Sequence, residues 1–287
     1  MKVGMIGTGL MGMPMALTLQ KAGHTVVAYN RSAEKLAPLA AAGIQTAANS
    51  AAVLHACDCT ILMLADAAAI AATLFTPDTQ AALAGHTLIQ MGTIAPEQSR
   101  DLQAQIEAAQ GQYLEAPVLG SIPQARDGSL IVMVGSTPAQ FEQWQPVLKT
   151  LGEQILHIGP VGTGAAVKLA MNQLIGSLTT AFALSLALVQ REQIPVETFM
   201  DIVRNSALYA PTFDKKLSRM CDRNFSNPNF PTKHLLKDMR LFAQAAESAG
   251  LETALADTVA TVVQQAIATG LADADYSALY AAVNPEV

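Results

Sequence analysis

A glycine-rich turn near the start of the chain constrains the fold more than any other feature of the sequence. Residues 2–6, "KVGMI", read as an apolar strand, and the six residues Gly7-Thr8-Gly9-Leu10-Met11-Gly12 follow at once. A helical segment and a second strand, "TVVAY" at 25–29, come next. In this context Gly7 permits a tight turn, Gly9 lets a pyrophosphate approach the backbone, and Gly12 lets helix and strand pack closely. The sequence therefore predicts a dinucleotide site at a helix N-terminus, with a purely structural turn as the alternative.

Short apolar runs and helical patterns alternate over the first half of the chain. Strands are predicted at 2–6, 25–29, 59–64, 87–91 and 129–134, and helices at segments such as 34–42 and 97–110. Several of the strands are apolar throughout, as in a sheet that is covered on both faces. The alternation predicts an α/β domain of the Rossmann type with a doubly wound, mostly parallel sheet.

The pattern changes near residue 160. A long helix is predicted over 163–190, followed by helices near 196–206, 233–249 and 254–270, without a convincing strand. We therefore expect a Rossmann domain over 1–161 and an all-helical substrate and dimerisation domain over 162–287. The long helix is so apolar that it needs cover on nearly all sides, which favours a homodimer or homotetramer.

Composition and charge exclude several classes of partner. The net charge of -6 argues against nucleic acid, because that binding needs many basic contacts to phosphate. Residues 174–189 are apolar but too few for a membrane span, and glycines interrupt the N-terminal apolar run that a signal peptide needs. The three cysteines have no metal-binding spacing, so we expect reduced thiols, no metal and a cytoplasmic location.

The second strand ends in Asn30-Arg31-Ser32, where NAD-binding proteins usually place a carboxylate on the ribose hydroxyls. A carboxylate there would repel the 2′-phosphate of NADP, and the neutral Asn30 removes that repulsion. Arg31 can donate two parallel hydrogen bonds to the phosphate, and the Ser32 hydroxyl can add a third. The segment predicts NADPH as the cofactor, unless Arg31 is a solvated surface residue.

Four ordered segments resemble the β-hydroxyacid dehydrogenase family, which includes 3-hydroxyisobutyrate dehydrogenases and tartronate semialdehyde reductases. They are the glycine turn and its strand at 7–31, "EAPVLGSIPQARDGSLIVMVG" at 115–135, "GPVGTGAAVKLAMNQL" at 159–174 and "FPTKHLLKDMRLF" at 230–242. The pairs Gly120-Ser121, Phe230-Pro231 and Lys237-Asp238, with Asn30-Arg31-Ser32, are most similar to glyoxylate/succinic semialdehyde reductases. The resemblance spans nearly the whole chain.

Lys168 and Asn172 lie four residues apart on the long helix, so their side chains share one face. The neighbourhood is apolar, and a lysine there is costly unless it meets an anionic or polar ligand or extends its amine to solvent. The resemblance implies that Lys168 is the proton donor to a carbonyl oxygen and that Asn172 orients the lysine or the substrate.

The resemblance also implies the remaining site residues. Gly120 and Ser121 would hold the substrate carboxylate, Phe230 and Asp238 would bound the substrate pocket, and Thr93 would lie beside the nicotinamide. Met63, Leu64 and Lys237 join the cofactor-binding set. The chain departs from the family at Leu119 and at Gly92, where serines are common, and both changes are expected to alter the substrate pocket.

The activity implied is the NADPH-dependent reduction of a small carboxylate-bearing aldehyde or 2-oxo acid. Glyoxylate would give glycolate, and succinic semialdehyde would give 4-hydroxybutyrate. A 3-hydroxyisobutyrate or tartronate semialdehyde dehydrogenase is the alternative within the family. Imine reduction is a second alternative, which Lys168 counts against. A non-catalytic NADP-binding sensor or scaffold is a third, in which Lys168 or Asn172 would be expected to be lost.

Overall fold

The computed structural model describes residues 1–285 and divides into two compact units, Met1–Leu169 and Ala170–Val287. The long helix α9 (Thr163–Arg191) contributes its first turns to the first unit and the rest to the second. The boundary expected between residues 161 and 162 remains a prediction.

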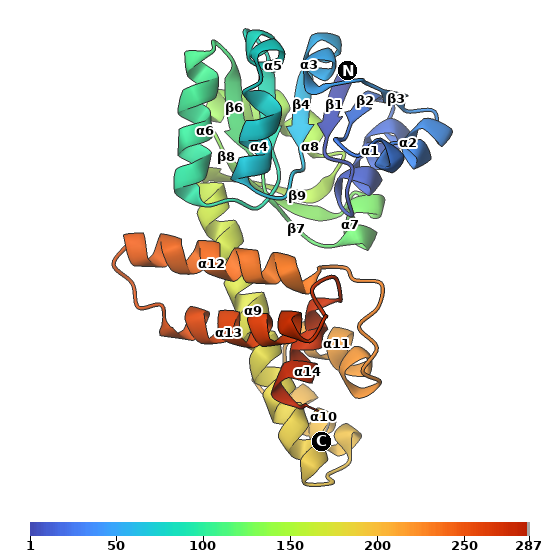
Figure 1. The fold of residues 1–287 in the computed structure, drawn as a ribbon, viewed down its shortest axis with the longest axis vertical. Helices are drawn as coiled ribbons and strands as arrows, with labels where there is room; N and C mark the ends of the chain where they lie inside the picture. Colours follow the sequence, from blue (N-terminus) through green and yellow to red (C-terminus); the bar gives the residue numbers. More distant parts are fainter. Residues whose placement is uncertain (286–287) are drawn as a thin grey trace. The chain divides into compact units, whose positions relative to one another are not determined.

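A twisted sheet forms the centre of the first unit (Figure 1). Within the described residues it has nine strands, β1 (Lys2–Ile6), β2 (Thr25–Tyr29), β3 (Gln45–Thr46), β4 (Cys59–Leu62), β5 (Thr87–Gln90), β6 (Gln112–Glu115), β7 (Val118–Leu119), β8 (Leu130–Gly135) and β9 (Gly152–Gly159). Their order is β3-β2-β1-β4-β5-β6-β8-β7, with β9 paired to β8. The first six strands of that path run parallel, and β8 runs antiparallel to β6 and β7. This is the strand order of a Rossmann fold, and the predicted fold class is confirmed.

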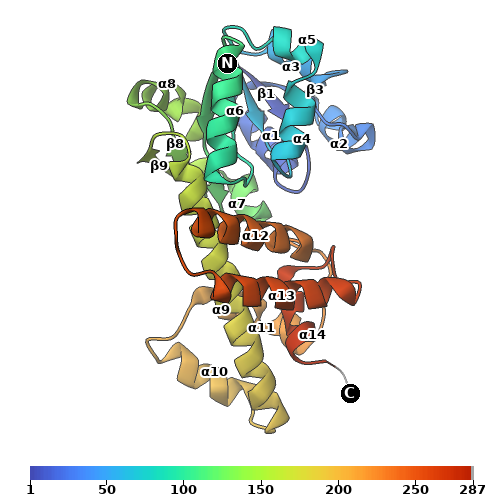
Figure 2. The ribbon, with the colours of Figure 1, turned by 60° about the vertical axis from the view of Figure 1, so that its left-hand side comes forward.

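Helices cover both faces of the sheet (Figures 1 and 2). They are α1 (Gly12–Lys21), α2 (Ala37–Ala41), α3 (Ser50–Ala56), α4 (Ala67–Leu74), α5 (Pro77–Ala81), α6 (Pro96–Ala108), α7 (Ile122–Asp127) and α8 (Pro138–Leu148), with a short 3₁₀ turn, η1 (Ala33–Lys35). Alternate strand residues face opposite sides of the sheet, so that Met5 belongs to a buried cluster with residues of α1, α2, α7 and α8, whereas Ile6 belongs to one with residues of α3, α4 and α6. The apolar clusters on the two faces bury the sheet, and because the strands are parallel their carboxyl ends lie along one edge of it.

The second unit is helical. Its elements are the later part of α9, α10 (Val196–Arg204), α11 (Pro211–Cys221), α12 (Thr232–Ser248), α13 (Ala254–Ala268), η2 (Tyr276–Ala278) and α14 (Leu279–Val283). Helices α12 and α13 lie side by side and share an apolar cluster with η2 and α14 (Figure 2). A second cluster joins α9 to α10 and α11 through Phe182, Met200 and Phe213. The predicted all-helical second part is confirmed.

Helix α9 is long and apolar enough to cross a membrane by length and composition alone. Its most apolar window has a mean hydropathy of 1.4 and is 39% buried. The core helix of a soluble protein meets the same criterion, so this is weak evidence. One face of α9 nevertheless exposes Leu174, Leu178, Leu184 and Leu188 at helical spacing. This face suits a second copy of the chain, but the homo-oligomer stays a prediction that light scattering would check.

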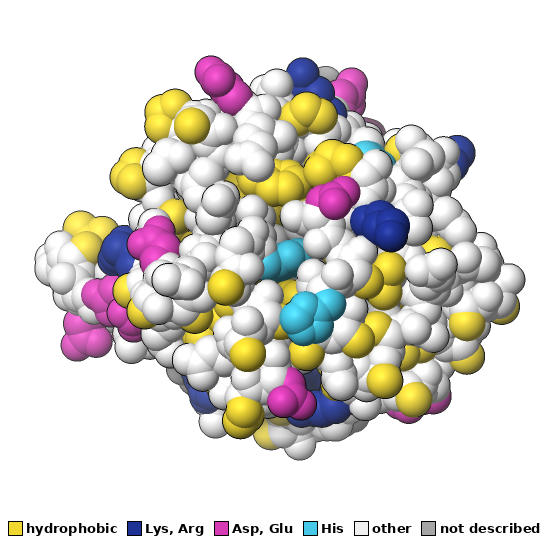
Figure 3. Space-filling view, turned by 90° about the horizontal axis from the view of Figure 1, so that it is seen from above, with side chains coloured by type: hydrophobic (Ala, Val, Ile, Leu, Met, Phe, Trp, Pro, Cys, Tyr) yellow, Lys and Arg dark blue, Asp and Glu magenta, His cyan; other side chains and the backbone are white. Residues whose placement is uncertain are grey.

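Acidic and basic side chains are interspersed on the face shown in Figure 3, with hydrophobic side chains between them. Within the described residues of that face, neither sign of charge gathers into a continuous field. An anionic ligand must therefore be held by local groups and not by the overall charge of -6.

Candidate active site

The turn between β1 and α1 has the glycine geometry that its sequence predicts. Gly7 adopts a φ of 95°, and a Cβ there would overlap the carbonyl oxygen of Met63. A Cβ on Gly12 would overlap the carbonyl oxygen of Gly7. Both positions therefore need glycine for the fold itself.

Gly9 differs from its two neighbours, because a Cβ there would have no heavy atom within 4 Å. The protein itself thus gives no reason for a glycine at this position. Helix α1 begins beside it with Met11 as N-cap, without a side-chain cap and without an acidic residue in the first turn. Open space over Gly9 and uncapped amides fit the pyrophosphate of a dinucleotide.

This contrast predicts different outcomes for two matched substitutions. Gly9→Ala should leave the free energy of unfolding within about 0.5 kcal/mol of the wild type, yet raise the Kd for NADPH by about tenfold or more. Gly12→Ala should destabilise the fold by about 1–3 kcal/mol, because its methyl group meets backbone. Urea unfolding and NADPH fluorescence titration would measure both effects. Unchanged NADPH affinity in Gly9→Ala would place the pyrophosphate elsewhere.

The end of β2 is tied to the glycine turn through Asn30. Thr8 N donates to Asn30 Oδ1 at 3.1 Å, and Asn30 Nδ2 donates to Ser32 O at 3.1 Å. Since the amide both accepts and donates here, a carboxylate at this position would lose the second bond. Arg31 is exposed, on the segment that Asn30 fixes beside the turn.

The carboxyl ends of β4 and β5 follow that of β1 along the parallel sheet. Met63 N donates to Ile6 O at 2.8 Å, so the segment after β4 begins beside the glycine turn. Met91 N donates to Leu62 O at 2.9 Å, so the segment after β5 begins beside the end of β4. A Cβ on Gly92 would lie 2.6 Å from Leu64 O. A side chain at Gly92 would therefore require a shift of this backbone, and the glycine keeps the residue before Thr93 close to Leu64. Met63, Leu64 and Thr93 thus lie at the carboxyl edge of the sheet, where ligands bind in such folds.

The buried side chain of Gln90 braces this turn. Its Oε1 accepts from Gly92 N at 2.5 Å, and its Nε2 donates to Gly92 O at 3.0 Å. Only an amide side chain can make both bonds. This role could not be predicted from the sequence, because the partners of Gln90 are backbone groups.

Strand β7 leads into α7 through Gly120, which has a φ of 138°. Ser121, the N-cap of α7, donates from its N at 2.9 Å and from its Oγ at 2.8 Å, both to Gln124 Oε1. The Ser121 amide and hydroxyl therefore converge on one oxygen, which here belongs to Gln124. The half-buried side chain of Leu119 stands just before them.

In the second unit three predicted residues come together. Asn172 and Asp238 are each 2% exposed, and Asn172 Nδ2 donates to Asp238 Oδ2 at 2.6 Å. Lys237 Nζ lies 2.9 Å from Asp238 Oδ1 as an ion pair. The sequence assigned these residues separate roles, whereas the structure joins the carboxamide, carboxylate and ammonium.

Phe230, a further predicted residue of the second unit, and Lys237 have different surroundings. Phe230 packs edge-on against Tyr276 with ring centroids 5.8 Å apart, so it takes part in the core of this unit. Lys237 lines a cavity of about 250 Å³ together with Lys233 and Arg240. Lys233 and Lys237 already form ion pairs with Asp273 and Asp238, so this cavity is not lined by unneutralised positive charge.

Lys168 is half-buried in the second turn of α9, next to the buried Leu169. The first turn is also buried, through Ala165. The lysine backbone is therefore held by packing on the first unit, and Asn172 follows one turn later on the same helix.

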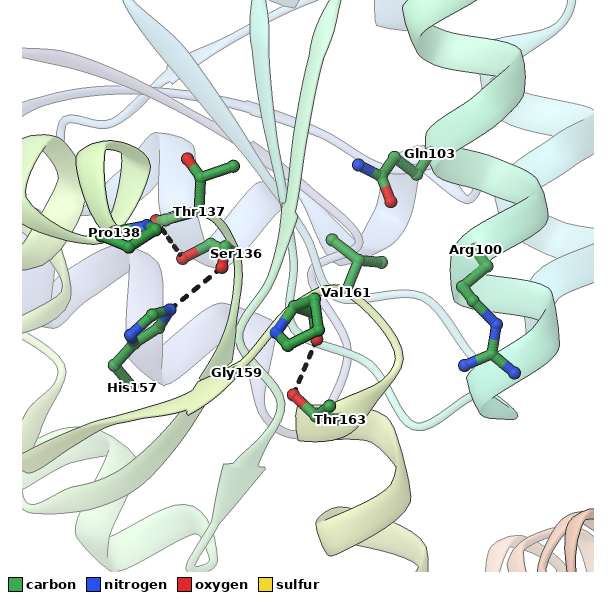
Figure 4. Close-up of a pocket in the computed structure, with 10 residues that line it drawn as sticks. Arg100, Gln103, Ser136, Thr137, Pro138, His157, Gly159, Val161 and Thr163 are labelled. Atoms are coloured by element: carbon green, nitrogen blue, oxygen red, sulfur yellow. Dashed lines mark hydrogen bonds between the residues drawn. The ribbon is translucent and has the colours of Figure 1, made fainter. Parts of the chain in front are cut away.

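The first unit has a separate cavity of about 760 Å³, and Figure 4 shows residues that line it. It lies between α6, which contributes Arg100 and Gln103, and the segment Ser136-Thr137-Pro138 after β8. His157 donates to Ser136 O at 3.0 Å and stacks on Phe141. None of the predicted site residues lines this cavity, so volume alone does not locate the predicted chemistry. Among residues 1–285 no cluster of three or more His, Cys, Asp or Glu side chains could hold a metal ion.

Comparisons with known proteins agree with this arrangement. Residues 2–159 match a family model described as the NAD binding domain of 6-phosphogluconate dehydrogenase. Residues 162–283 match one described as NAD-binding of NADP-dependent 3-hydroxyisobutyrate dehydrogenase. Both descriptions name a nicotinamide dinucleotide, in accord with the glycine turn.

Individual relatives cover nearly the full chain. Glyoxylate/succinic semialdehyde reductase 1 of Arabidopsis thaliana is 33% identical over 99% of this chain and 98% of its own length. The 2-(hydroxymethyl)glutarate dehydrogenase of Eubacterium barkeri is 30% identical over 97% and 93%. The crystal structure of 3-hydroxyisobutyrate dehydrogenase from Salmonella typhimurium has a TM-score of 0.87 and 26% identity, over 97% of this chain and 98% of that one. The chain therefore belongs to the β-hydroxyacid dehydrogenase family and is a nicotinamide-dependent oxidoreductase.

Proposed function

We propose that this protein uses NADPH to reduce a small aldehyde or 2-oxo acid that carries a carboxylate, with glyoxylate and succinic semialdehyde as the first candidates. The observation that carries the proposal is the 33% identity, over nearly the whole chain, to a plant protein named for these two substrates. A lysine in the second turn of α9, at the position where the family places its proton donor, supports the same chemistry.

NADPH is preferred over NADH in this proposal because of Asn30-Arg31-Ser32. The amide of Asn30 is satisfied by Thr8 and Ser32 and brings no negative charge to the end of β2. Arg31 is exposed on that segment and can reach a 2′-phosphate. The amides of the glycine turn and of the first turn of α1 hold the pyrophosphate.

A bound dihydronicotinamide supplies the hydride to the carbonyl carbon. As negative charge develops on the carbonyl oxygen, the Lys168 ammonium donates a hydrogen bond and then a proton to it, and becomes a neutral amine. In the direction of alcohol oxidation the neutral amine takes the hydroxyl proton. Lys168 is half-buried beside the buried Leu169, and partial removal from water strengthens such an interaction.

Asn172 assists through the orientation of its amide. Its Nδ2 is committed to the Asp238 carboxylate, so its Oδ1 is the atom that can accept a hydrogen bond from the lysine one turn before it or from the substrate. Asp238 is fixed in turn by Lys237. Asp238 and Lys237 thus determine that the oxygen of the Asn172 amide, and not its nitrogen, is available to the lysine or the substrate.

The substrate carboxylate is held by Gly120 and Ser121 in this proposal. The Ser121 amide and hydroxyl already converge on one carboxamide oxygen, that of Gln124. A carboxylate oxygen is a stronger acceptor for the same two donors, and it takes this place when the Gln124 side chain moves aside.

A substrate panel with both cofactors tests the proposal. Glyoxylate, succinic semialdehyde, tartronate semialdehyde and methylmalonate semialdehyde would be supplied in turn with NADPH and with NADH, and the loss of cofactor absorbance followed. We expect turnover with NADPH and at least one of the first two acids. NADPH binding without turnover on any carbonyl would support a non-catalytic sensor or scaffold instead. A preference for either of the last two would assign the chain to another branch of the family.

A further inference from the structure

The carboxylate of Glu115 is buried at the start of the helix that carries Lys168. Glu115 ends strand β6 and is 0% exposed. Its Oε1 accepts hydrogen bonds from Gly162 N at 2.8 Å and from Ala165 N at 3.1 Å. These amides belong to the residue before α9 and to its first turn, so one carboxylate oxygen caps the helix.

The other oxygen, Oε2, is held from helix α6. Ser99 Oγ donates a short hydrogen bond to it, and Tyr113 Oη lies 2.8 Å from Ser99 Oγ. Because the one proton of the Ser99 hydroxyl goes to the carboxylate, the Tyr113 hydroxyl donates to Ser99. Both residues are 0% exposed. The position of the carboxylate is therefore set by β6, which carries Glu115, and by α6, which carries Ser99, independently of its contacts with α9.

Two glycines make room for this carboxylate. A Cβ on Gly135 would overlap Glu115 Oε1, and a Cβ on Gly164 would lie 3.2 Å from the same atom. Burial raises the pKa of Glu115, whereas hydrogen bonds from Ser99 and from the first amides of α9 oppose that rise. The positive end of the helix also favours the ionised form. The surroundings of Glu115 thus provide both the space and the hydrogen-bond donors that a carboxylate needs.

We infer that Glu115 is a positioning residue that fixes the first turn of α9 and thereby directs the Lys168 amine. The inference rests on the proposed role of Lys168 as proton donor. Lys168 comes three residues after Ala165, so its backbone is held by the turn that Glu115 caps. A catalytic group displaced by about 1 Å can lose about 100-fold in rate.

Glu115→Gln is the direct test, because the carboxamide has the same shape but carries no charge. Its NH₂ group must face either the helix amides or the Ser99 hydroxyl, and it cannot accept from whichever it faces. We expect kcat to fall about 10- to 100-fold, with the Kd for NADPH unchanged because the glycine turn is not altered. An unchanged kcat in a folded Glu115→Gln would overturn the inference.

A double-mutant cycle separates positioning from a general loss of structure. If Glu115 acts through the lysine, Glu115→Gln should lower kcat in the wild type but have little further effect in Lys168→Ala. Equal effects in both backgrounds would show that Glu115 does not act through Lys168. Near-normal turnover in Lys168→Ala would instead reject the proposed function. Loss of turnover in Lys168→Ala with a normal Glu115→Gln would reject only the present inference.

Glu115→Asp keeps the inference testable if the Gln variant does not fold. It retains the charge, but its shorter side chain cannot hold the Ser99 hydroxyl and both helix amides together. We expect kcat to fall here too, again only when Lys168 is present, and a wild-type kcat would overturn the inference. Asn49→Ala is the matched control, because Asn49 caps α3 in the same unit by accepting from Ala52 N at 2.8 Å. It should lower the melting temperature and leave kcat unchanged.

Discussion

Replacement of Lys168 by alanine should lower kcat by about 10²- to 10⁴-fold, the range over which a positioned acid accelerates proton transfer. The carbonyl oxygen then develops negative charge without an ammonium beside it. NADPH affinity should stay near the wild-type value, because the glycine turn and the Asn30-Arg31-Ser32 segment do not involve this side chain. Steady-state turnover and NADPH fluorescence titration measure the two quantities on the same preparation.

Lys168→Arg sharpens this test. The guanidinium keeps the positive charge and can hydrogen bond to the oxygen, but it does not give up its proton at any ordinary pH. Turnover should therefore remain low in Lys168→Arg if proton donation is the essential step, and should recover in part if charge alone is enough. Lys149→Ala, at an exposed lysine that follows α8, is the control and should have no effect. Turnover near the wild-type rate in Lys168→Ala would remove Lys168 from the mechanism and reopen imine reduction as the chemistry.

The fold class could be predicted because its determinants are local. The glycine turn, the strands beside it and the change to helical patterns near residue 160 are each visible within a short window. The strands that were not predicted, β3, β6, β7 and β9, lack such signals: β6 has four residues with polar residues at both ends, and β7 has two residues. Strand β3 has two residues, and β9 is a partly exposed strand whose sequence, "GEQILHIG", mixes polar and apolar residues without a clear period. These strands form only because neighbouring strands offer them hydrogen bonds.

The candidate site could be predicted only in part, for the same physical reason. Residue types and the family resemblance pointed to Asn172 and Asp238, but their hydrogen bond joins positions 66 residues apart and no local pattern encodes it. Glu115 begins a segment that resembles the family, yet its partners are backbone amides 47 and 50 residues later. Backbone amides have no sequence signature. The roles predicted for the site residues remain predictions until the substitutions are made.

The substitution Arg31→Asp should reverse the cofactor preference of the enzyme. Hydrogen bonds to a charged group contribute about 1.5–3 kcal/mol, so their loss should lower kcat/KM for NADPH by about 10- to 100-fold. The new carboxylate also repels the 2′-phosphate, and it can accept hydrogen bonds from the ribose hydroxyls of NADH. We therefore expect kcat/KM for NADH to stay level or rise while the value for NADPH falls.

Two further variants separate the phosphate contact from the overall charge. Lys149→Asp makes the net charge more negative by the same amount, at an exposed position that follows α8, and should leave the NADPH/NADH ratio unchanged. Arg31→Lys keeps the charge but loses the planar pair of donors, so its ratio should lie between those of the wild type and Arg31→Asp. If Arg31→Asp left the ratio where it is in the wild type, the arginine would be a solvated surface residue. The proposed preference for NADPH would then lose the contact on which it rests.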